Sequence, residues 1–181
     1  MARKSRIHFP GALYHVTLRG NAGQDVFLSP EDRTRFYLLL QEGIERFGHR
    51  IHAFCLMTNH IHLVVQIAEK SLSGIMQNLS FRYTQWYNRT HNQGGHLFQG
   101  RYKAVLVDSD AYLLELVRYV NLNPVRAGMV EDPASYEWSS HRAYCGAEVI
   151  PWLRVDFVLG QLGETAEAAC RAYRKFAADG L

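Results

Sequence analysis

Long apolar runs, internal repeats and low-complexity segments are all missing from this chain of 181 residues. No eighteen consecutive residues are apolar, and the first six, MARKSR, lead into a strand-like segment without the apolar core of a signal peptide. We therefore expect a soluble, cytoplasmic protein that does not enter a membrane. A hydrophobic content of 48% is enough for one good core, so we expect one domain with a tail.

Cysteine is also scarce. Cys55, Cys145 and Cys170 are odd in number and widely spaced, and no two of them have the short spacing of a zinc site. A disulfide framework and a cysteine metal centre are both disfavoured. The sequence predicts three free, buried thiols.

Acidic residues are absent from residues 71–107, although the net charge of the whole chain is only +3. Basic side chains can neutralise phosphates and aromatic faces can stack on unpaired bases, so their mixture in this segment favours a nucleic-acid partner. The alternative is a solvated basic face over an aromatic core, and the pattern alone leaves both open. The basic residues are Arg82, Arg89, Arg101 and Lys103, and the aromatic ones are Phe81, Tyr83, Trp86, Tyr87, Phe98 and Tyr102.

The periodicity of apolar residues predicts alternating strands and helices. Residues 11–19 alternate, with Tyr14 and Val16 on one face and His15 and Thr17 on the other. Ser29-Pro30 begins a helix as cap and first residue. The expected elements are a strand at 11–19, a helix at 30–48, strands at 51–57 and 61–67, a helix from Ser71 or Ser73 to about 89, and a strand at 98–107 with a bend at Gly100.

This order, strand, helix, strand, strand, helix, strand, predicts an α+β fold of the ferredoxin-like, split βαβ type. Its antiparallel sheet would carry the helices on one face and would place the first and third strands side by side at the centre. The polar faces that carry His15 and His60 would then form one surface.

A third helix is expected after the fourth strand, capped by Asp108 or Ser109 and covering residues 111–122. Pro124 disfavours helical geometry at Asn123, so the helix should end there. We place one domain at residues 1–142 and a helical appendage at 143–181, with a helical pattern over 164–178.

Two histidines at the start of an apolar strand are the first candidate site. His60 and His62 point to the same face because strand side chains alternate, and two adjacent imidazoles can share a divalent metal. The structural alternative is a pair of hydrogen-bonded strand histidines. A third ligand would be needed, and Asn123 can offer its amide oxygen one helical turn after Tyr119, so that a ligand and a phenol arrive together.

Four blocks in order resemble a known family. They read YHVTLRGN at 14–21, NHIHLV at 59–64, GHLFQGRYK at 95–103 and RYVNLNPVRAG at 118–128, with WSSHR at 138–142 as a weaker fifth. The second block is similar to the HUH motif of the single-tyrosine transposases, and the set resembles their branch of REP-associated tyrosine transposases.

The resemblance implies an enzyme that cleaves and rejoins single-stranded DNA at hairpins. It implies Tyr119 as the nucleophile of a 5′-phosphotyrosine intermediate, with His60, His62 and Asn123 holding Mg²⁺ or Mn²⁺. A set of two histidines and an asparagine also suits zinc, and relatives can carry glutamine where Asn123 stands. The residues proposed to grip phosphates are Arg19, Arg101, Lys103 and Arg126.

Several alternatives stay open. A domesticated relative could bind DNA hairpins without strand transfer, but it would not need His60, His62 and Tyr119 together. A zinc hydrolase would need an acid near the pair, and the nearest one after it, Glu69, follows the far end of the strand. The sequence does not distinguish a monomer from a homodimer in which Tyr119 serves the partner's histidines. A DNA-acting protein of this kind is expected at the nucleoid.

Overall fold

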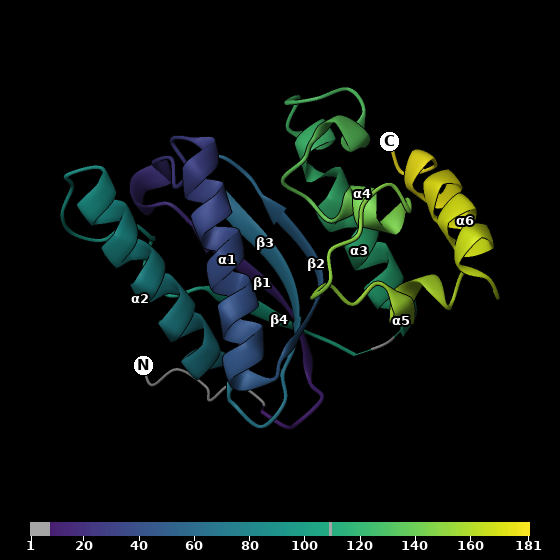
Figure 1. Ribbon diagram of the computed structural model, residues 1–181, viewed down its shortest axis with the longest axis horizontal. Coiled ribbons are helices and arrows are strands. Elements are labelled where there is room, and N and C mark those ends of the chain that lie inside the picture. Colours follow the sequence, from purple (N-terminus) through teal and green to yellow (C-terminus); the bar gives the residue numbers. More distant parts are fainter. Residues whose placement is uncertain (1–7, 109) are drawn as a thin grey trace.

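A four-stranded antiparallel sheet is the centre of the computed structural model, which describes residues 8–108 and 110–181 (Figure 1). The strands lie in the order β2-β3-β1-β4, so the first and third strands are the central pair, as predicted. The α+β fold class is confirmed. The strands are β1 (Leu13–Arg19), β2 (Arg50–Leu56), β3 (His60–Gln66) and β4 (Lys103–Val107).

Helices α1 (Pro30–Phe47) and α2 (Leu72–Thr90) pack side by side on one face of this sheet. The side chain of Ser29 accepts a hydrogen bond from the backbone of Asp32 at the start of α1, and Gly48 ends the helix with a left-handed φ of 67°. Ser71 caps α2 by accepting from the backbone of Gly74. Both predicted helices begin where their local signals indicate.

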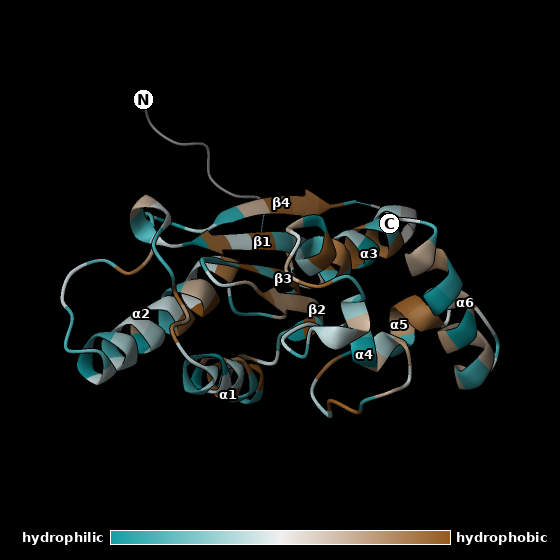
Figure 2. Cartoon of the chain, turned by 90° about the horizontal axis from the view of Figure 1, so that it is seen from above, coloured by the Kyte–Doolittle hydropathy of each residue, from teal (hydrophilic) through white to brown (hydrophobic). Residues whose placement is uncertain are grey.

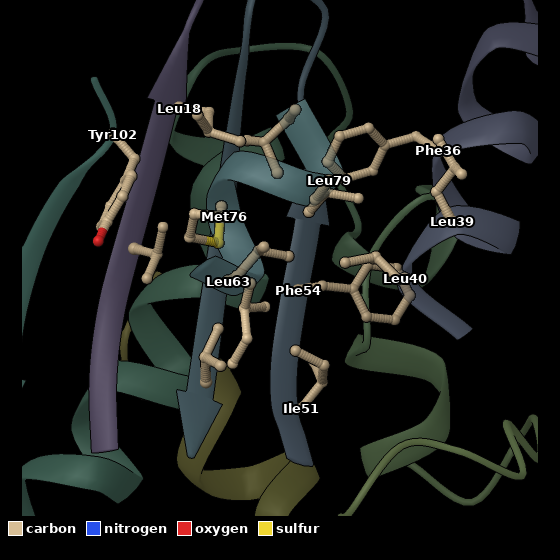
Figure 3. Close-up of a cluster of buried hydrophobic side chains, with 14 of the residues drawn as sticks. Leu18, Phe36, Leu39, Leu40, Ile51, Phe54, Leu63, Met76, Leu79 and Tyr102 are labelled. Carbon is tan, nitrogen blue, oxygen red and sulfur yellow. The ribbon is translucent and has the colours of Figure 1, made fainter. Parts of the chain in front are cut away.

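The main core fills the space between the sheet and these two helices (Figure 3). Leu18 from β1, Leu63 from β3, Phe36 from α1 and Met76 from α2 converge there, and each is no more than 2% exposed. Burial of these alternate strand residues decides which face of each strand meets the core. The intervening residues, His15 and His62 among them, must therefore face the other side of the sheet.

The other face is covered by α3 (Asp110–Arg126) and the C-terminal segment, as Figures 1 and 2 show. A second core joins Cys55 and Val64 of the sheet to Val117 and Val120 of α3 and to Tyr173 of the tail. The two layers of helices thus lie on opposite faces of the sheet, with α1 and α2 on one face, as predicted, and α3, which carries Tyr119, on the other. The remaining helices are η1 (Asn21–Gly23), η2 (Pro133–Ser135), α4 (His141–Tyr144), α5 (Asp156–Leu159) and α6 (Ala166–Ala178).

Helix α3 does not end at Asn123, so that prediction is wrong. It continues through Pro124 to Arg126. Proline has no N–H to donate to the carbonyl of Val120. The Asn123 side chain compensates, because its Nδ2 donates to the carbonyl oxygens of Tyr119 at 2.7 Å and of Val120 at 3.4 Å. The predicted cap at Ser109 lies outside the described residues.

The fourth strand is shorter than the predicted range of 98–107. Phe98 makes an isolated bridge with Gly20, and regular pairing with β1 begins only at Lys103, opposite Thr17. Gly100 between them has a φ of 61°, a left-handed value that breaks the extended backbone. The bend that the sequence suggested at Gly100 is therefore a full interruption of the strand.

The three cysteines are free thiols, with Cys55 and Cys170 buried and Cys145 half-buried. None of the helices in the described part of the chain combines the length and apolar character that a membrane span needs. The domain boundary placed after residue 142 stays a prediction.

Candidate active site

The histidine pair lies at the start of β3, where the central strands meet. In the pairing of β1 with β3, Arg19 is opposite His60 and Thr17 is opposite His62. The two imidazole rings are 5.0 Å apart between centroids. Their shared face is the one turned toward α3, since the other face of β3 carries Ile61 and Leu63 into the main core.

His15 is a third imidazole in this cluster, and no motif in the sequence had assigned it to the site. On β1 it stands two positions from Thr17, so it is a diagonal neighbour of His62 across the strand pair. Its Nε2 lies 3.0 Å from Nδ1 of His62. The alternation of β1 had predicted that His15 lies on the same face of the sheet as the histidine pair. Only the register between β1 and β3 shows that it contacts His62.

Helix α3 brings Tyr119 to the same place. The ring of Tyr119 lies edge-on to His62 and to His15, with centroid separations of 5.8 Å and 6.0 Å. Tyr119 is accessible to solvent: its side chain is 38% exposed, and it lines an open groove of about 480 Å³ together with His15 and Arg126. A phosphodiester arriving from solvent can therefore reach the phenol beside the histidines.

Burial keeps these imidazoles uncharged at neutral pH. Loss of hydration lowers the pKa of His62 to about 3, and the positive charges of His15, His60 and Arg19 add to the effect. The pKa of His60 is lowered by burial and by Arg19, and that of His15 by burial. A neutral imidazole has a free lone pair, which is the form that coordinates a metal ion.

This donor set fits a divalent cation at His60 and His62. Nδ1 of His60 is held at 2.7 Å by Oδ1 of Asn59, which leaves its Nε2 free to coordinate. Asn123 lies one turn beyond Tyr119 and uses its Nδ2 on the helix backbone, so its Oδ1 is the atom that could serve as a ligand. Within the residues that the structure describes, no three His, Cys, Asp or Glu side chains are arranged to hold a metal.

The predicted phosphate-binding residues are all exposed, but they do not form one cluster. Arg19 is opposite His60, and the guanidinium of Arg126 lies 5.2 Å from the centre of the Tyr119 ring. Lys103 is opposite Thr17 on the edge strand β4. Arg101 lines a different groove, of about 560 Å³, between α2 and the segment before β4. Arg19 and Arg126 thus adjoin the histidines and Tyr119, Lys103 lies in the same cross-strand row as His62 with Thr17 between them, and Arg101 belongs to a separate groove.

Two other motif residues hold α3 in place. Asn121 is fully buried, and its Nδ2 donates to the hydroxyl of Tyr173 at 2.7 Å while its Oδ1 accepts from Ser140 Oγ at 2.6 Å. Ser140 also accepts from the backbone of Phe54 in β2. Of the two asparagines near Tyr119, Asn121 is therefore structural. The weaker WSSHR block contributes Ser140 to the support of the site.

The comparisons agree with the motifs. The family model described as "Transposase IS200 like" matches residues 9–123, a range that includes the three histidines, Tyr119 and Asn123. A protein of Haemophilus influenzae, assigned by its name to the REP-associated tyrosine transposases, is 25% identical over 142 residues, which are 67% of this chain and 80% of the relative.

A solved structure supports the same fold. It is a REP-associated tyrosine transposase bound to a REP hairpin, and it superposes with a TM-score of 0.68 at 14% identity, over 83% of this chain and 89% of that one. The family expected from the motifs is confirmed, because the family model spans more than half of the sequence. This chain belongs to the IS200-like transposase family.

Proposed function

We propose that this transposase cleaves and rejoins single-stranded DNA at hairpin sequences, with Tyr119 as the nucleophile. The observation that carries the proposal is the placement of the Tyr119 ring against His15 and His62 in an open groove of the same chain. The solved relative that was bound to a REP hairpin supports the choice of a DNA hairpin as substrate.

Cleavage would be a direct transfer of the phosphoryl group. The phenol oxygen of Tyr119 attacks the phosphorus while the bond to the 3′ oxygen breaks, and that oxygen leaves as a 3′-hydroxyl after taking a proton. The downstream strand stays attached through a 5′-phosphotyrosine. One phosphoester replaces another, so a second 3′-hydroxyl can reverse the step on a new strand without ATP.

The residues around Tyr119 would share the remaining work. His60, His62 and the Oδ1 of Asn123 are the side chains proposed to hold Mg²⁺ or Mn²⁺. When bound, such an ion polarises the scissile phosphate and stabilises negative charge in the transition state. Arg126 lines the groove and Arg19 lies opposite His60, and both can bind phosphate oxygens through charge-assisted hydrogen bonds. The exposed Lys103, on the edge strand, and the exposed Arg101, in the other groove, are proposed to contact the flanking strand.

A labelled-strand assay tests the proposal. Hairpin oligonucleotides with single-stranded flanks are taken from the repeats of the source genome and are labelled at either end, and the full chain is incubated with them with and without Mn²⁺. A denaturant-resistant protein–DNA adduct is expected only with the 3′ label and only with metal. The 5′ label should appear in a shorter, free strand that ends in a 3′-hydroxyl.

Two variants on one helix provide the control. Tyr119→Phe should abolish the adduct, whereas Tyr112→Phe, which changes another tyrosine of the same groove, should retain it. An adduct that survives Tyr119→Phe, or one that carries the 5′ label, contradicts the proposed chemistry. Tight hairpin binding without any adduct would indicate the alternative, a binding protein that has lost strand transfer.

A further inference from the structure

Each histidine of the pair has a hydrogen-bonding neighbour at its Nδ1 atom. For His60 the neighbour is Oδ1 of Asn59, at 2.7 Å, and for His62 it is Nε2 of His15, at 3.0 Å. The two neighbours come from different elements, since Asn59 lies in the turn before β3 and His15 lies on β1. In both histidines the Nδ1 atom is therefore the one that contacts a neighbour, and the two neighbours are unrelated side chains.

The contact of Asn59 determines where the proton of His60 lies. The Nδ2 of Asn59 donates to the carbonyl oxygen of Gly23 at 3.4 Å, and this orients the amide so that Oδ1 faces His60. An amide oxygen can only accept. The proton of neutral His60 must then be on Nδ1, and the lone pair is on Nε2.

The contact of His15 with His62 has the geometry of a hydrogen bond as well. Their ring planes are 21° apart with 5.2 Å between centroids. This separation is close to the largest that a nitrogen contact of 3.0 Å allows, so the two ring edges meet end to end. That is the geometry of a hydrogen bond between two imidazoles, in which one nitrogen donates and the other accepts.

We propose that His15 and Asn59 are positioning residues that hold His62 and His60 with their protons on Nδ1 and so present both Nε2 lone pairs to one cation. His15 would accept from His62 through its own Nε2, with its proton on Nδ1. The proton position of His60 follows from the Asn59 amide alone. The choice of His62 as the donor to His15 rests on the proposed function, because only that direction leaves Nε2 of His62 free for a cation. His15 is thus placed behind a ligand rather than among the ligands, as second-layer partners of metal-binding histidines commonly are.

The proton positions can be measured on the full chain without metal. Long-range ¹H–¹⁵N correlation spectra distinguish the two neutral forms of each imidazole. Both His60 and His62 are expected in the Nδ1–H form. In His15→Phe the His62 ring should shift toward the Nε2–H form that free imidazole side chains favour, and in Asn59→Ala the same should happen to His60. A wild-type His62 protonated on Nε2 overturns the proposal, whether or not the protein binds metal.

Binding of Co²⁺ alone, followed by its visible absorption and by calorimetry, gives the second readout. His15→Phe should weaken Co²⁺ binding about ten- to a hundredfold. His15→Gln, whose Oε1 can take the place of Nε2 as acceptor, should retain most of the Co²⁺ affinity that His15→Phe loses. At the other histidine, Asn59→Ala should weaken Co²⁺ binding and Asn59→Asp should retain most of it. His96→Gln removes an exposed histidine from another groove and should have no effect.

The outcomes separate this proposal from the proposed function. Equal Co²⁺ affinity in wild type and His15→Phe, or equal loss in His15→Phe and His15→Gln, contradicts the positioning role of His15. A wild-type protein that binds no Co²⁺ but shows both Nδ1–H forms would contradict the metal site of the proposed function and leave the positioning contacts correct. If His15→Phe does not fold, the exposed Asn59 variants carry the same test at His60.

Discussion

The rings of Tyr119 and His62 lie edge to face, 5.8 Å apart between centroids, within a single chain. Helix α3 achieves this because its apolar stripe, which includes Val117 and Val120, packs on the sheet face opposite the main core. The tyrosine follows on the flank of that stripe and meets the histidines where β1 and β3 pair. A second chain is not needed to bring the phenol to the pair.

Mixing two variants that should each be inactive tests this arrangement. Tyr119→Phe lacks the proposed nucleophile and His62→Ala lacks a proposed ligand. If each tyrosine serves its own histidines, an equimolar mixture should form no adduct above the level of either variant alone. Gel detection of the 3′-labelled adduct provides the measurement. Recovery of a large share of wild-type adduct would mean that Tyr119 acts on the histidines of a partner chain.

Arg126→Ala should weaken the engagement of DNA beside Tyr119. The guanidinium lies over the Tyr119 ring at the edge of the groove and is exposed, so its loss should leave the free energy of unfolding within about 0.5 kcal/mol of wild type. Removing one phosphate contact should reduce the slope of log affinity against log salt by about 0.7 for a single strand. Titration of hairpin DNA at several salt concentrations measures this slope.

Arg171→Ala is the matched control for Arg126→Ala. Arg171 is also an exposed helical arginine, but it lies on α6, where it pairs with Glu167. Its removal should leave the salt slope unchanged. Equal slopes for Arg126→Ala and wild type would show that Arg126 contacts no phosphate.

Tyr173→Phe should destabilise the protein without touching the groove. The hydroxyl of Tyr173 accepts from Nδ2 of Asn121, which is fully buried, so the variant leaves a buried donor unpaired. A loss of about 1–3 kcal/mol in the free energy of unfolding is expected. Urea denaturation measures it, and Val149→Ala, at a position that is 89% exposed, should change it by less than about 0.5 kcal/mol. A Tyr173→Phe protein as stable as wild type would argue against the importance of this network.

Acid should destabilise the protein through His49. This residue is 2% exposed, and burial lowers its pKa from 6.5 to about 4. In the unfolded chain it takes up a proton as the pH falls below 6.5, whereas in the folded chain it stays neutral until about 4. The free energy of unfolding should therefore fall across this window, by on the order of 2–4 kcal/mol from this group.

Urea denaturation at pH 7 and at pH 5 measures the effect. His49→Leu should show a smaller difference between the two pH values than wild type, because one group that binds a proton only in the unfolded chain is gone. His96→Leu, at an exposed position, should behave as wild type. An unchanged pH dependence in His49→Leu would mean that other buried histidines dominate.

Local chemistry made most of the elements predictable. The cap at Ser29 and the proline at position 30 define the start of α1 within a few residues, and the alternation around Tyr14 and Val16 defines the faces of β1. Such signals depend only on neighbours in the chain. The order of the elements then sufficed for the ferredoxin-like class, and the spacing within 60–62 placed both histidines on one face.

Two predictions from local signals were wrong, the end of α3 and the start of β4. Pro124 should have ended α3, but the side chain of Asn123 supplies the donor that proline lacks. The strand expected from Phe98 is interrupted because Gly100 turns, although Gln99 still donates to Arg19 of β1. The continuation of α3 depends on a hydrogen bond that forms only in the folded helix, whereas glycine preference indicated a bend at Gly100 but not the full loss of strand pairing there.

The sequence by itself determined the class of fold, the pair His60 and His62, and the presence of a tyrosine and an asparagine one helical turn apart. Only the tertiary structure decided that His15 joins the pair, that Asn121 is buried as a support, and that Tyr119 faces its own histidines. The physical reason is that strand register and helix packing are set by burial of apolar faces across the whole sheet, which brings together side chains that no local pattern connects.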